Sequence, residues 1–438
     1  MISPNGDVQA GDMSREQRRG WLVVLAAMVG VAVGLSPLPF YTIGMFAPEL
    51  SKAFGWSFAS MMGSIGVQSA VVMVSGPVAG FAVDRWGARP VALVSLVLFG
   101  LCFMSLSLSN GSLMLYYAQW GVMSVVGAGT LSATWTRVVN GWFDRNRGLA
   151  LGLASTGTGL TGFLIKPFAA WIIADYGWRT AFVAIGLLPI VLGVPVVLWL
   201  FRENRDAPGA VTPQAGEPIV EEYGVTLIEA LRSVRFWVLG AAFLLIAFAL
   251  TAPTPNLENI FKTFHFSLSE IARVTAGFGL AVIAGRIIGG WLLDRFWAPA
   301  CAFVILLFPA FGSWMLSGET LSGQGALAAV ICLGFGAGFE FDLLAYLISR
   351  YFGQRHYGVI YGCFYTVIAF GGGLGPVVYG YAFDTSGTYR GALLVGVCCV
   401  LAGGALLFLL GPYPRWEDRV THLRNSPELE RSARNKGA

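Results

Sequence analysis

Apolar segments of about 20 residues, each ending in a short charged or Gly-, Pro- or Asn-containing stretch, recur along almost the whole chain. A helix needs roughly 20 mostly apolar residues to cross the hydrocarbon core of a bilayer. The 438 residues are 56% hydrophobic and 12% charged, whereas a soluble protein carries about 25% charged residues. The chain is therefore expected to be an all-α membrane protein with many spans.

Twelve such segments can be placed, six on each side of a polar stretch at residues 202–235. The six expected spans of the first half, residues 21–201, are 21–47, 58–82, 90–109, 112–139, 148–174 and 180–201. The six of the second half, residues 236–411, are 236–257, 269–293, 299–317, 324–349, 358–383 and 390–411. Residues 1–20 and 412–438 are expected to be polar tails. Thr226 and Glu229 have the spacing of a capping box, which predicts a short interfacial helix before the seventh span.

The distribution of positive charge gives the expected orientation. If residues 1–20 are cytoplasmic, most of the 28 Lys and Arg residues fall on the cytoplasmic side, as the positive-inside rule requires. Both tails are therefore expected in the cytoplasm, and no cleaved signal peptide is expected. This assignment leaves Lys166 and Arg286 as the two cations inside spans.

The two halves carry matching sequences at matching positions. SGPVAGFAVDR at residues 75–85 recurs as GRIIGGWLLDR at residues 285–295, and WFDRNRG at residues 142–148 recurs as YFGQRHYG at residues 351–358. A parallel repeat of six spans is the construction of a rocking transporter, whose substrate site lies near the middle of the membrane between the halves. The repeat predicts two pseudo-symmetric six-helix halves with such a site.

The pattern of cysteines and histidines gives no support for metal or redox chemistry. The six cysteines fall in apolar segments without Cys-x-x-Cys or Cys/His spacing, which indicates packing residues. The three histidines fall in loops or in the tail. We expect no metal, no cofactor and no nucleic-acid partner. No nucleophile–base arrangement indicates an enzyme.

A charged motif after the second span carries a family resemblance. GFAVDRWGAR at residues 80–89 resembles the G-x-x-x-D-R-x-G-x-R signature of the major facilitator superfamily, and GWLLDR at residues 290–295 is a degenerate copy. The glycine allows two helices to approach closely. The charges can latch one conformation through ion pairs and helix-end contacts; alternatively, the arginines only set topology. The expected gating residues are Gly80, Asp84, Arg85, Gly87, Arg89, Asp294 and Arg295.

The start of the fifth span narrows the resemblance. WFDRNRGLALGLASTGTGLTG at residues 142–162 resembles a pattern of the monocarboxylate transporters, which bacterial oxalate–formate antiporters share in part. Trp142, Arg145, Asn146 and Thr156 depart from that pattern, and a second monocarboxylate signature near the first span is absent. The resemblance implies the twelve-helix major facilitator fold and a small organic anion as substrate.

Arg286 and Lys166 are candidate ligands for that anion. A charge at a helix centre costs at least about 2.5–3.5 kcal/mol on insertion scales, which favours a functional role. The transporters that this chain resembles bind the substrate carboxylate with an arginine in the eighth span, which implies this role for Arg286; a fixed ion pair with Glu340 or Asp342 is the alternative. The resemblance also places the fifth span beside the eighth, so that Lys166 can face the same cavity, unless it snorkels to the outer interface.

Glu340 and Asp342 are candidate proton-coupling residues. Residues two apart on a helix point about 200° apart, so we expect that both cannot face the cavity. Asp342 shares its face with residues that run to the cytoplasmic end, which favours a structural role at the gate. Glu340 must find a cation or be protonated. Further residues are expected to line the cavity, although ordinary helix packing is an equal alternative for each: Tyr41, Gln119, Asn256, Tyr361 and Tyr365.

These patterns favour a secondary active transporter that moves a small, monocarboxylate-like organic anion by alternating access. Coupling to a proton or to a counter-anion is expected, as is a monomer in the lipid bilayer of a bacterial inner membrane. Multidrug or metabolite efflux by proton antiport is the alternative, which the lysine before Pro167 disfavours for cationic substrates. A transporter-like sensor would need a large extra domain, and the loops and tails are too short for one.

Overall fold

The computed structural model describes residues 5–143, 146–203 and 224–414, and these residues are almost entirely helical. The first half comprises α1 (Asn5–Ala32), α2 (Pro37–Phe54), α3 (Phe58–Trp86), α4 (Ala88–Ser105), α5 (Leu113–Gly127), α6 (Ser132–Trp142), α7 (Arg147–Ser155), α8 (Gly157–Leu188) and α9 (Val194–Leu200). The second half comprises α11 (Val234–Thr251), α12 (Leu257–Thr263), α13 (Leu268–Leu293), α14 (Ala298–Leu316), α15 (Gly323–Tyr351), α16 (Tyr357–Ser386) and α17 (Arg390–Leu406). The predicted interfacial helix is α10 (Leu227–Arg232), and its capping box between Thr226 and Glu229 is present.

These helices make the twelve predicted spans. Ten segments of the described residues are long and apolar enough to cross a membrane. One of them, Arg147–Leu200, holds two spans, because Gly177 leaves helical geometry at a φ of 80° within α8. The fourth span, which consists of α5, the 3-10 turn Ala128–Thr130 and α6, is not among the ten. The predicted fold class is therefore confirmed.

The polar segments agree less well with the sequence-based expectation. α1 already begins at Asn5, so helix extends through most of the stretch 1–20 that was expected to be a tail. Residues 1–4, 204–223 and 415–438, which include most of the central polar stretch and of the C-terminal tail, lie outside the described residues.

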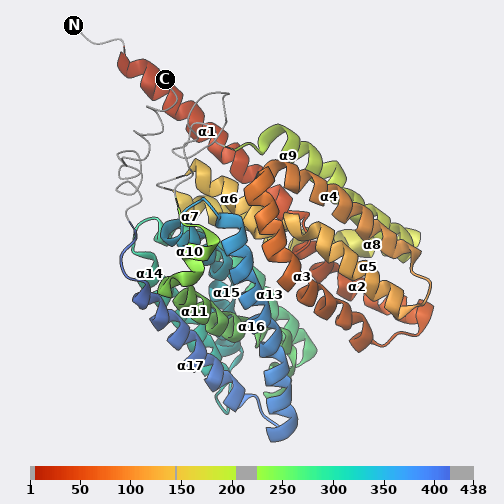
Figure 1. The fold of residues 1–438 in the computed structure, drawn as a ribbon. Coiled ribbons are helices and arrows are strands. Elements are labelled where there is room, and N and C mark those ends of the chain that lie inside the picture. The colour runs from red at the N-terminus through yellow and green to blue at the C-terminus, as the bar shows by residue number, and fades with distance from the viewer. Residues whose placement is uncertain (1–4, 144–145, 204–223, 415–438) are drawn as a thin grey trace.

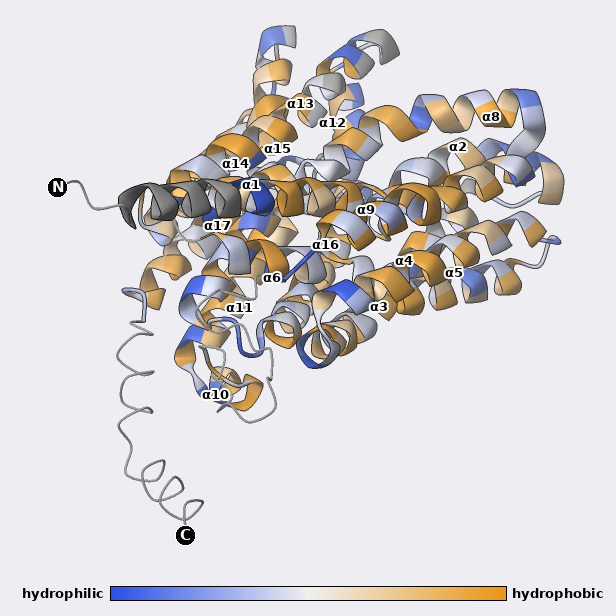
Figure 2. Ribbon diagram, turned by 90° about the horizontal axis from the view of Figure 1, so that it is seen from above, coloured by the Kyte–Doolittle hydropathy of each residue, from blue (hydrophilic) through white to orange (hydrophobic). Residues whose placement is uncertain are grey.

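Figure 2 shows apolar residues along much of α4 and α8, as expected for helices that face lipid.

The first span is broken between α1 and α2, and neighbouring helices satisfy the exposed backbone groups. The break precedes Pro37 and Pro39. The Leu35 N–H donates to Thr130 Oγ1 over 2.9 Å, and Gln68 Nε2 donates to the Leu35 carbonyl over 3.0 Å. An irregular backbone is tolerated at membrane depth only where protein or water satisfies it. Hydrogen bonds from neighbouring helices of the first half therefore stabilise the break.

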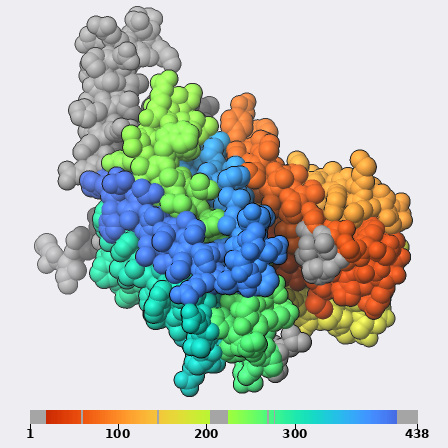
Figure 3. Space-filling view, turned by 90° about the horizontal axis from the view of Figure 1, so that it is seen from below, coloured from red at the N-terminus to blue at the C-terminus, as the bar shows by residue number. Residues whose placement is uncertain are grey.

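The two halves meet at one end of the bundle, which we call the motif end because α3 and α13 finish there, next to Asp84 and Asp294. At this end α3 packs against α16, and α7 packs against α13. In Figure 1, α2, α5 and α8 of the first half and α16 and α17 of the second half diverge from the region of α6 and α7. Figure 3 shows the halves as two lobes of different colour.

Glycines allow the backbones of the two halves to touch at the motif end. A Cβ added at Gly80 of α3 would lie 2.1 Å from the Gly358 carbonyl oxygen of α16, and one added at Gly148 of α7 would lie 2.2 Å from that of Gly290 in α13. Gly80 and Gly290 occupy equivalent positions in the sequence repeat, as do Gly148 and Gly358. The repeat seen in the sequence therefore produces two equivalent helix contacts.

Candidate functional site: a buried charge cluster between the two halves

Two carboxylates hold the starts of helices that belong to the opposite half. Asp84 of α3 accepts hydrogen bonds from the backbone N–H groups of Gly358 and Val359, each over 2.9 Å. Asp294, directly after α13, accepts from Gly148 N over 2.6 Å and from Leu149 N over 2.9 Å. A negative charge at a helix N-terminus is stabilised by the unpaired N–H groups and by the helix dipole. Burial raises the pKa of Asp294, and the two backbone N–H donors oppose that rise.

Within the part of the chain that the structure describes, the arginines of the motif do not form the ion pairs that were expected between the two halves. Arg89 donates to the Leu198 carbonyl over 2.5 Å within the first half. Arg85 is exposed, and Arg295 is exposed with its guanidinium 3.8 Å from the centroid of the Trp291 ring. Gly87 ends α3 with a φ of 88°. The contacts of the motif between the two halves are therefore made by the aspartates and the helix starts, and the interdomain ion pairs expected of Arg85, Arg89 and Arg295 are not found among the described residues.

Two arginines at the gate were missed by the sequence analysis. Arg137 pairs with Asp84 and also donates to the Gln354 carbonyl over 3.2 Å. Arg147 is only 3% exposed and donates to Ser349 Oγ of α15 over 3.2 Å. Arg137 lies within the expected span 112–139, so Lys166 and Arg286 are not the only cations inside spans.

Arg286 lies at the centre of a buried cluster between the halves. Its side chain projects from α13, and the residue is 7% exposed. Arg286 Nη1 lies 3.5 Å from Asp342 Oδ1 of α15, and Ser155 Oγ, at the end of α7 in the first half, donates to the same oxygen over 2.5 Å. Among the described residues, Arg286 Nε and Asp342 Oδ2 have no hydrogen-bond partner. The cluster therefore joins both halves and keeps hydrogen-bonding capacity unused.

Glu340 belongs to this cluster as well. It is 3% exposed, it interacts electrostatically with Arg286, and within the described part of the chain its Oε1 has no hydrogen-bond partner. Arg286 interacts electrostatically with both Glu340 and Asp342, so both carboxyl groups belong to the cluster. The ion pair that was the alternative for Arg286 is formed, with Asp342.

Lys166 and Arg286 share a neighbour, Tyr41 of α2. The Lys166 ammonium lies 5.8 Å from the centroid of the Tyr41 ring, and the Tyr41 hydroxyl interacts electrostatically with Arg286. Gly162, one helical turn before Lys166, packs against the same ring, and Gly159 packs against Ile283 of α13. Lys166 is exposed, and it lies on the face of α8 that carries these two glycines.

The remaining expected cavity residues occupy different places. Tyr361 and Tyr365 of α16 lie near the cluster, because Tyr361 interacts with Asp342 and Tyr365 with Glu340. Gln119 instead donates to the Ser105 carbonyl within the first half, over 2.8 Å. The seventh span is broken between α11 and α12 by the 3-10 turn Thr254–Asn256, and there Asn256 donates to the Ala252 carbonyl over 3.0 Å. Tyr41, Tyr361 and Tyr365 are thus brought together with Arg286, whereas Gln119 and Asn256 make local contacts.

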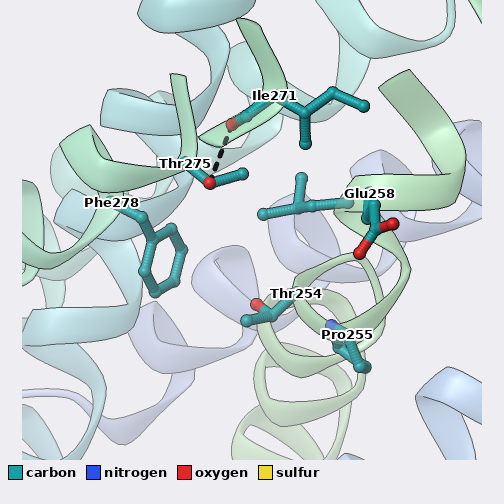
Figure 4. A pocket seen from close by; sticks show the side chains of 7 residues that line it. Thr254, Pro255, Glu258, Ile271, Thr275 and Phe278 are labelled. Carbon is teal, nitrogen blue, oxygen red and sulfur yellow. Dashed lines mark hydrogen bonds between the residues drawn. The ribbon is translucent and has the colours of Figure 1, made fainter. Parts of the chain in front are cut away.

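A cavity of about 500 Å³ lies beside the break of the seventh span. Figure 4 shows Thr254, Pro255 and Glu258 on one side of this cavity and Ile271, Thr275 and Phe278 of α13 on the other. The hydroxyl of Thr275 donates to the Ile271 carbonyl of its own helix over 2.8 Å. Arg286, Glu340 and Asp342 are not among the residues that line this cavity.

The family of the chain follows from a sequence match across the same spans. The model of the Major Facilitator Superfamily matches residues 29–376. The chain belongs to the major facilitator superfamily. It is an integral, multi-pass membrane protein and a secondary transporter of small molecules.

Individual relatives agree with this assignment. Human monocarboxylate transporter 11 is 26% identical, over 88% of this chain and 82% of the relative. An uncharacterized 38 kDa protein of Thermoproteus tenax is 30% identical, over 84% of this chain and 90% of its own length. The crystal structure of the E. coli fucose:proton symporter shares the fold with a TM-score of 0.65 at 16% identity, covering 90% of this chain and 98% of that one. The resemblance to the monocarboxylate branch of the superfamily is confirmed.

Proposed function

We propose that this major facilitator transporter carries a small, monocarboxylate-like organic anion by alternating access, and that Arg286 binds its carboxylate. The observation that carries the proposal is that the buried Arg286 guanidinium keeps unused hydrogen-bond donors. It is buried between the halves, its Nε has no partner among the described residues, and its nearest carboxylate oxygen is 3.5 Å away. That distance exceeds the 2.7–2.9 Å of a charge-assisted hydrogen bond.

An arginine in this condition is suited to bind a carboxylate. The guanidinium presents N–H donors in a planar fork that matches a carboxylate in a bidentate arrangement. A buried donor without a partner costs about 1–3 kcal/mol, and an incoming carboxylate would remove that cost. The printed names of relatives such as monocarboxylate transporter 11 support the same class of substrate.

We infer that a proton accompanies the anion. Arg286 carries one positive charge and is flanked by two carboxyl groups, Glu340 and Asp342. Adding one anion and one proton leaves the net charge of the buried cluster unchanged, which avoids a costly uncompensated charge in the membrane. Glu340 is the better proton site, because Asp342 already accepts a hydrogen bond from Ser155. Exchange against a counter-anion would also leave the net charge of the cluster unchanged, so it is the alternative to proton coupling.

The motif end is proposed to face the cytoplasm, with both termini on that side. The positive-inside rule supports this orientation, since most of the Lys and Arg residues of the loops lie at that end. The described conformation, closed at the motif end, would then be open toward the outside of a bacterial inner membrane.

Uptake by proteoliposomes tests the proposed substrate class and coupling together. Labelled mono- and dicarboxylates are offered with and without an imposed pH gradient. We expect uptake of at least one acid to be accelerated by the gradient, and we expect Glu340→Gln to lose this acceleration while it retains exchange of the same acid, because a glutamine cannot release a proton.

The controls separate the alternatives. Glu319→Gln replaces a carboxyl that is exposed and paired with Arg390, and it should keep the response to the gradient. Uptake that ignores the gradient but needs an acid inside the vesicle would replace proton coupling by anion exchange. Export of a lipophilic cation with no uptake of any acid would establish the efflux alternative.

Lys166→Ala is expected to raise the KM of the transported acid about tenfold with a smaller change in kcat. The ammonium lies against Tyr41, which also adjoins Arg286, so its charge would attract an anion approaching the cluster. Initial rates at graded substrate concentrations measure the effect. Lys262→Ala is the matched control, because Lys262 is exposed and paired with Glu258. A normal KM for Lys166→Ala would leave this lysine the role of snorkelling to the interface.

A further inference from the structure

Asp342 receives donors from both halves of the transporter on a single oxygen. Ser155 Oγ of the first half donates to Oδ1 over 2.5 Å, and Arg286 Nη1 of the second half lies 3.5 Å from the same atom. The other oxygen, Oδ2, has no partner in the described part of the chain. The aspartate is therefore bonded closely across the interface and only loosely to the arginine of its own half.

The position of Ser155 depends on the contact between the halves. Ser155 is the last residue of α7. A Cβ added at Gly152, one turn earlier, would lie 2.3 Å from the Arg286 carbonyl oxygen, so the backbones of α7 and α13 touch at this level. At the other end of α7, the backbone N–H groups of Gly148 and Leu149 donate hydrogen bonds to Asp294. When the motif end opens, α7 must leave α13, and Ser155 must leave Asp342.

We propose that Ser155 holds Asp342 away from Arg286 while the motif end is closed, and that its withdrawal on opening lets Asp342 displace the substrate carboxylate from Arg286. Ser155 would then be a positioning residue for substrate release. The inference rests on the proposed function of Arg286, and it adds a reason why the anion leaves at the motif end.

The surroundings of Asp342 favour its movement from Ser155 to Arg286. Without the hydroxyl of Ser155, the carboxylate would keep both oxygens without a close donor in a buried site, which is costly. The donors within reach are those of Arg286, whose Nε is also unused. The other titratable groups near this pair include Glu340, Tyr361 and Tyr41. None of these three supplies a positive charge, so Arg286 is the group to which a released Asp342 would move.

The test compares Ser155→Ala with the conservative variant Ser155→Thr in the uptake assay. Without the hydroxyl, Asp342 competes for Arg286 in every state, so Ser155→Ala should raise the KM about tenfold and leave kcat within about twofold. Ser155→Thr retains a hydroxyl and should restore a KM near that of the wild type. In Ser155→Ala/Asp342→Asn the competing charge is absent, so its KM should equal that of Asp342→Asn alone.

Ser124→Ala is the matched control for the loss of a buried hydroxyl. Ser124 is fully buried, and its Oγ donates to the Trp120 carbonyl of its own helix over 2.7 Å. A KM for Ser155→Ala no higher than that for Ser124→Ala would overturn the inference. Additive effects of Ser155→Ala and Asp342→Asn on the KM would overturn it as well.

A structure of the substrate-free Ser155→Ala variant tests the same step without any transported acid. The distance from Arg286 Nη1 to Asp342 Oδ1 should shorten from 3.5 Å to about 2.8 Å, the length of a charge-assisted hydrogen bond. An unchanged distance would refute the positioning role. If no acid is transported but this distance shortens, the proposed substrate is wrong while the exchange of partners by Asp342 stands.

Discussion

Arg286→Ala is expected to reduce uptake of the transported acid by about 100-fold or more. The substitution removes the charge that would bind the substrate carboxylate, and it leaves Glu340 and Asp342 without their cation in a buried site. Arg286→Lys should recover only a small part of the activity, because an ammonium cannot bind a carboxylate in the bidentate manner of a guanidinium. Initial uptake rates of purified protein in liposomes measure both variants.

Arg390→Ala controls for the loss of an arginine as such. Arg390 is exposed and pairs with Glu319 over 3.1 Å, and its removal should leave uptake within about twofold of the wild type. Gel filtration of each variant in detergent distinguishes loss of transport from loss of folding. A correctly folded Arg286→Ala protein with normal uptake would contradict the proposed binding site.

Gly80→Ala is expected to reduce transport at least about tenfold while the protein remains folded. The added methyl group would lie 2.1 Å from the Gly358 carbonyl oxygen, closer than any contact that two such atoms tolerate, so α3 and α16 would have to separate. The closed motif end would then be strained, whereas the open arrangement would not contain this contact. The turnover rate and the apparent melting temperature in detergent measure the two expectations.

Gly44→Ala in α2 is the matched control. Within the described residues, no atom outside its own helix segment lies within 4 Å of a Cβ added at Gly44. Replacing a helical glycine by alanine otherwise favours the helix by about 1 kcal/mol, so this variant should transport normally and be slightly more stable. Equal behaviour of Gly80→Ala and Gly44→Ala would show that closure does not require contact of α3 with α16.

The fold was accessible from the sequence because its main signals are local. Apolar length predicts the spans, and the repeat of residues 75–85 at 285–295 predicts the two halves. The breaks were harder to predict. The interruption at Leu35 is stable because Thr130 and Gln68, on other spans, bond to its backbone. Such compensation depends on the packed structure and leaves no pattern in the segment itself.

The charged residues of the candidate site could be predicted from the sequence, but the residues that contact them could not. Arg286, Glu340 and Asp342 are conspicuous because a charge is costly in a membrane. Ser155 is an ordinary small residue in a small-residue stretch, and only the close approach of α7 to α13 brings its hydroxyl to Asp342. Likewise, Asp84 was expected at the gate, but its acceptor role toward Gly358 and Val359 requires the two halves to be placed together.

The two aspartate contacts at the motif end also make the attachment of the halves redundant. Each half accepts hydrogen bonds from the start of a helix of the other half, so the two contacts join the halves at equivalent positions of the sequence repeat. Because the two contacts share no residue, the loss of one leaves the other in place.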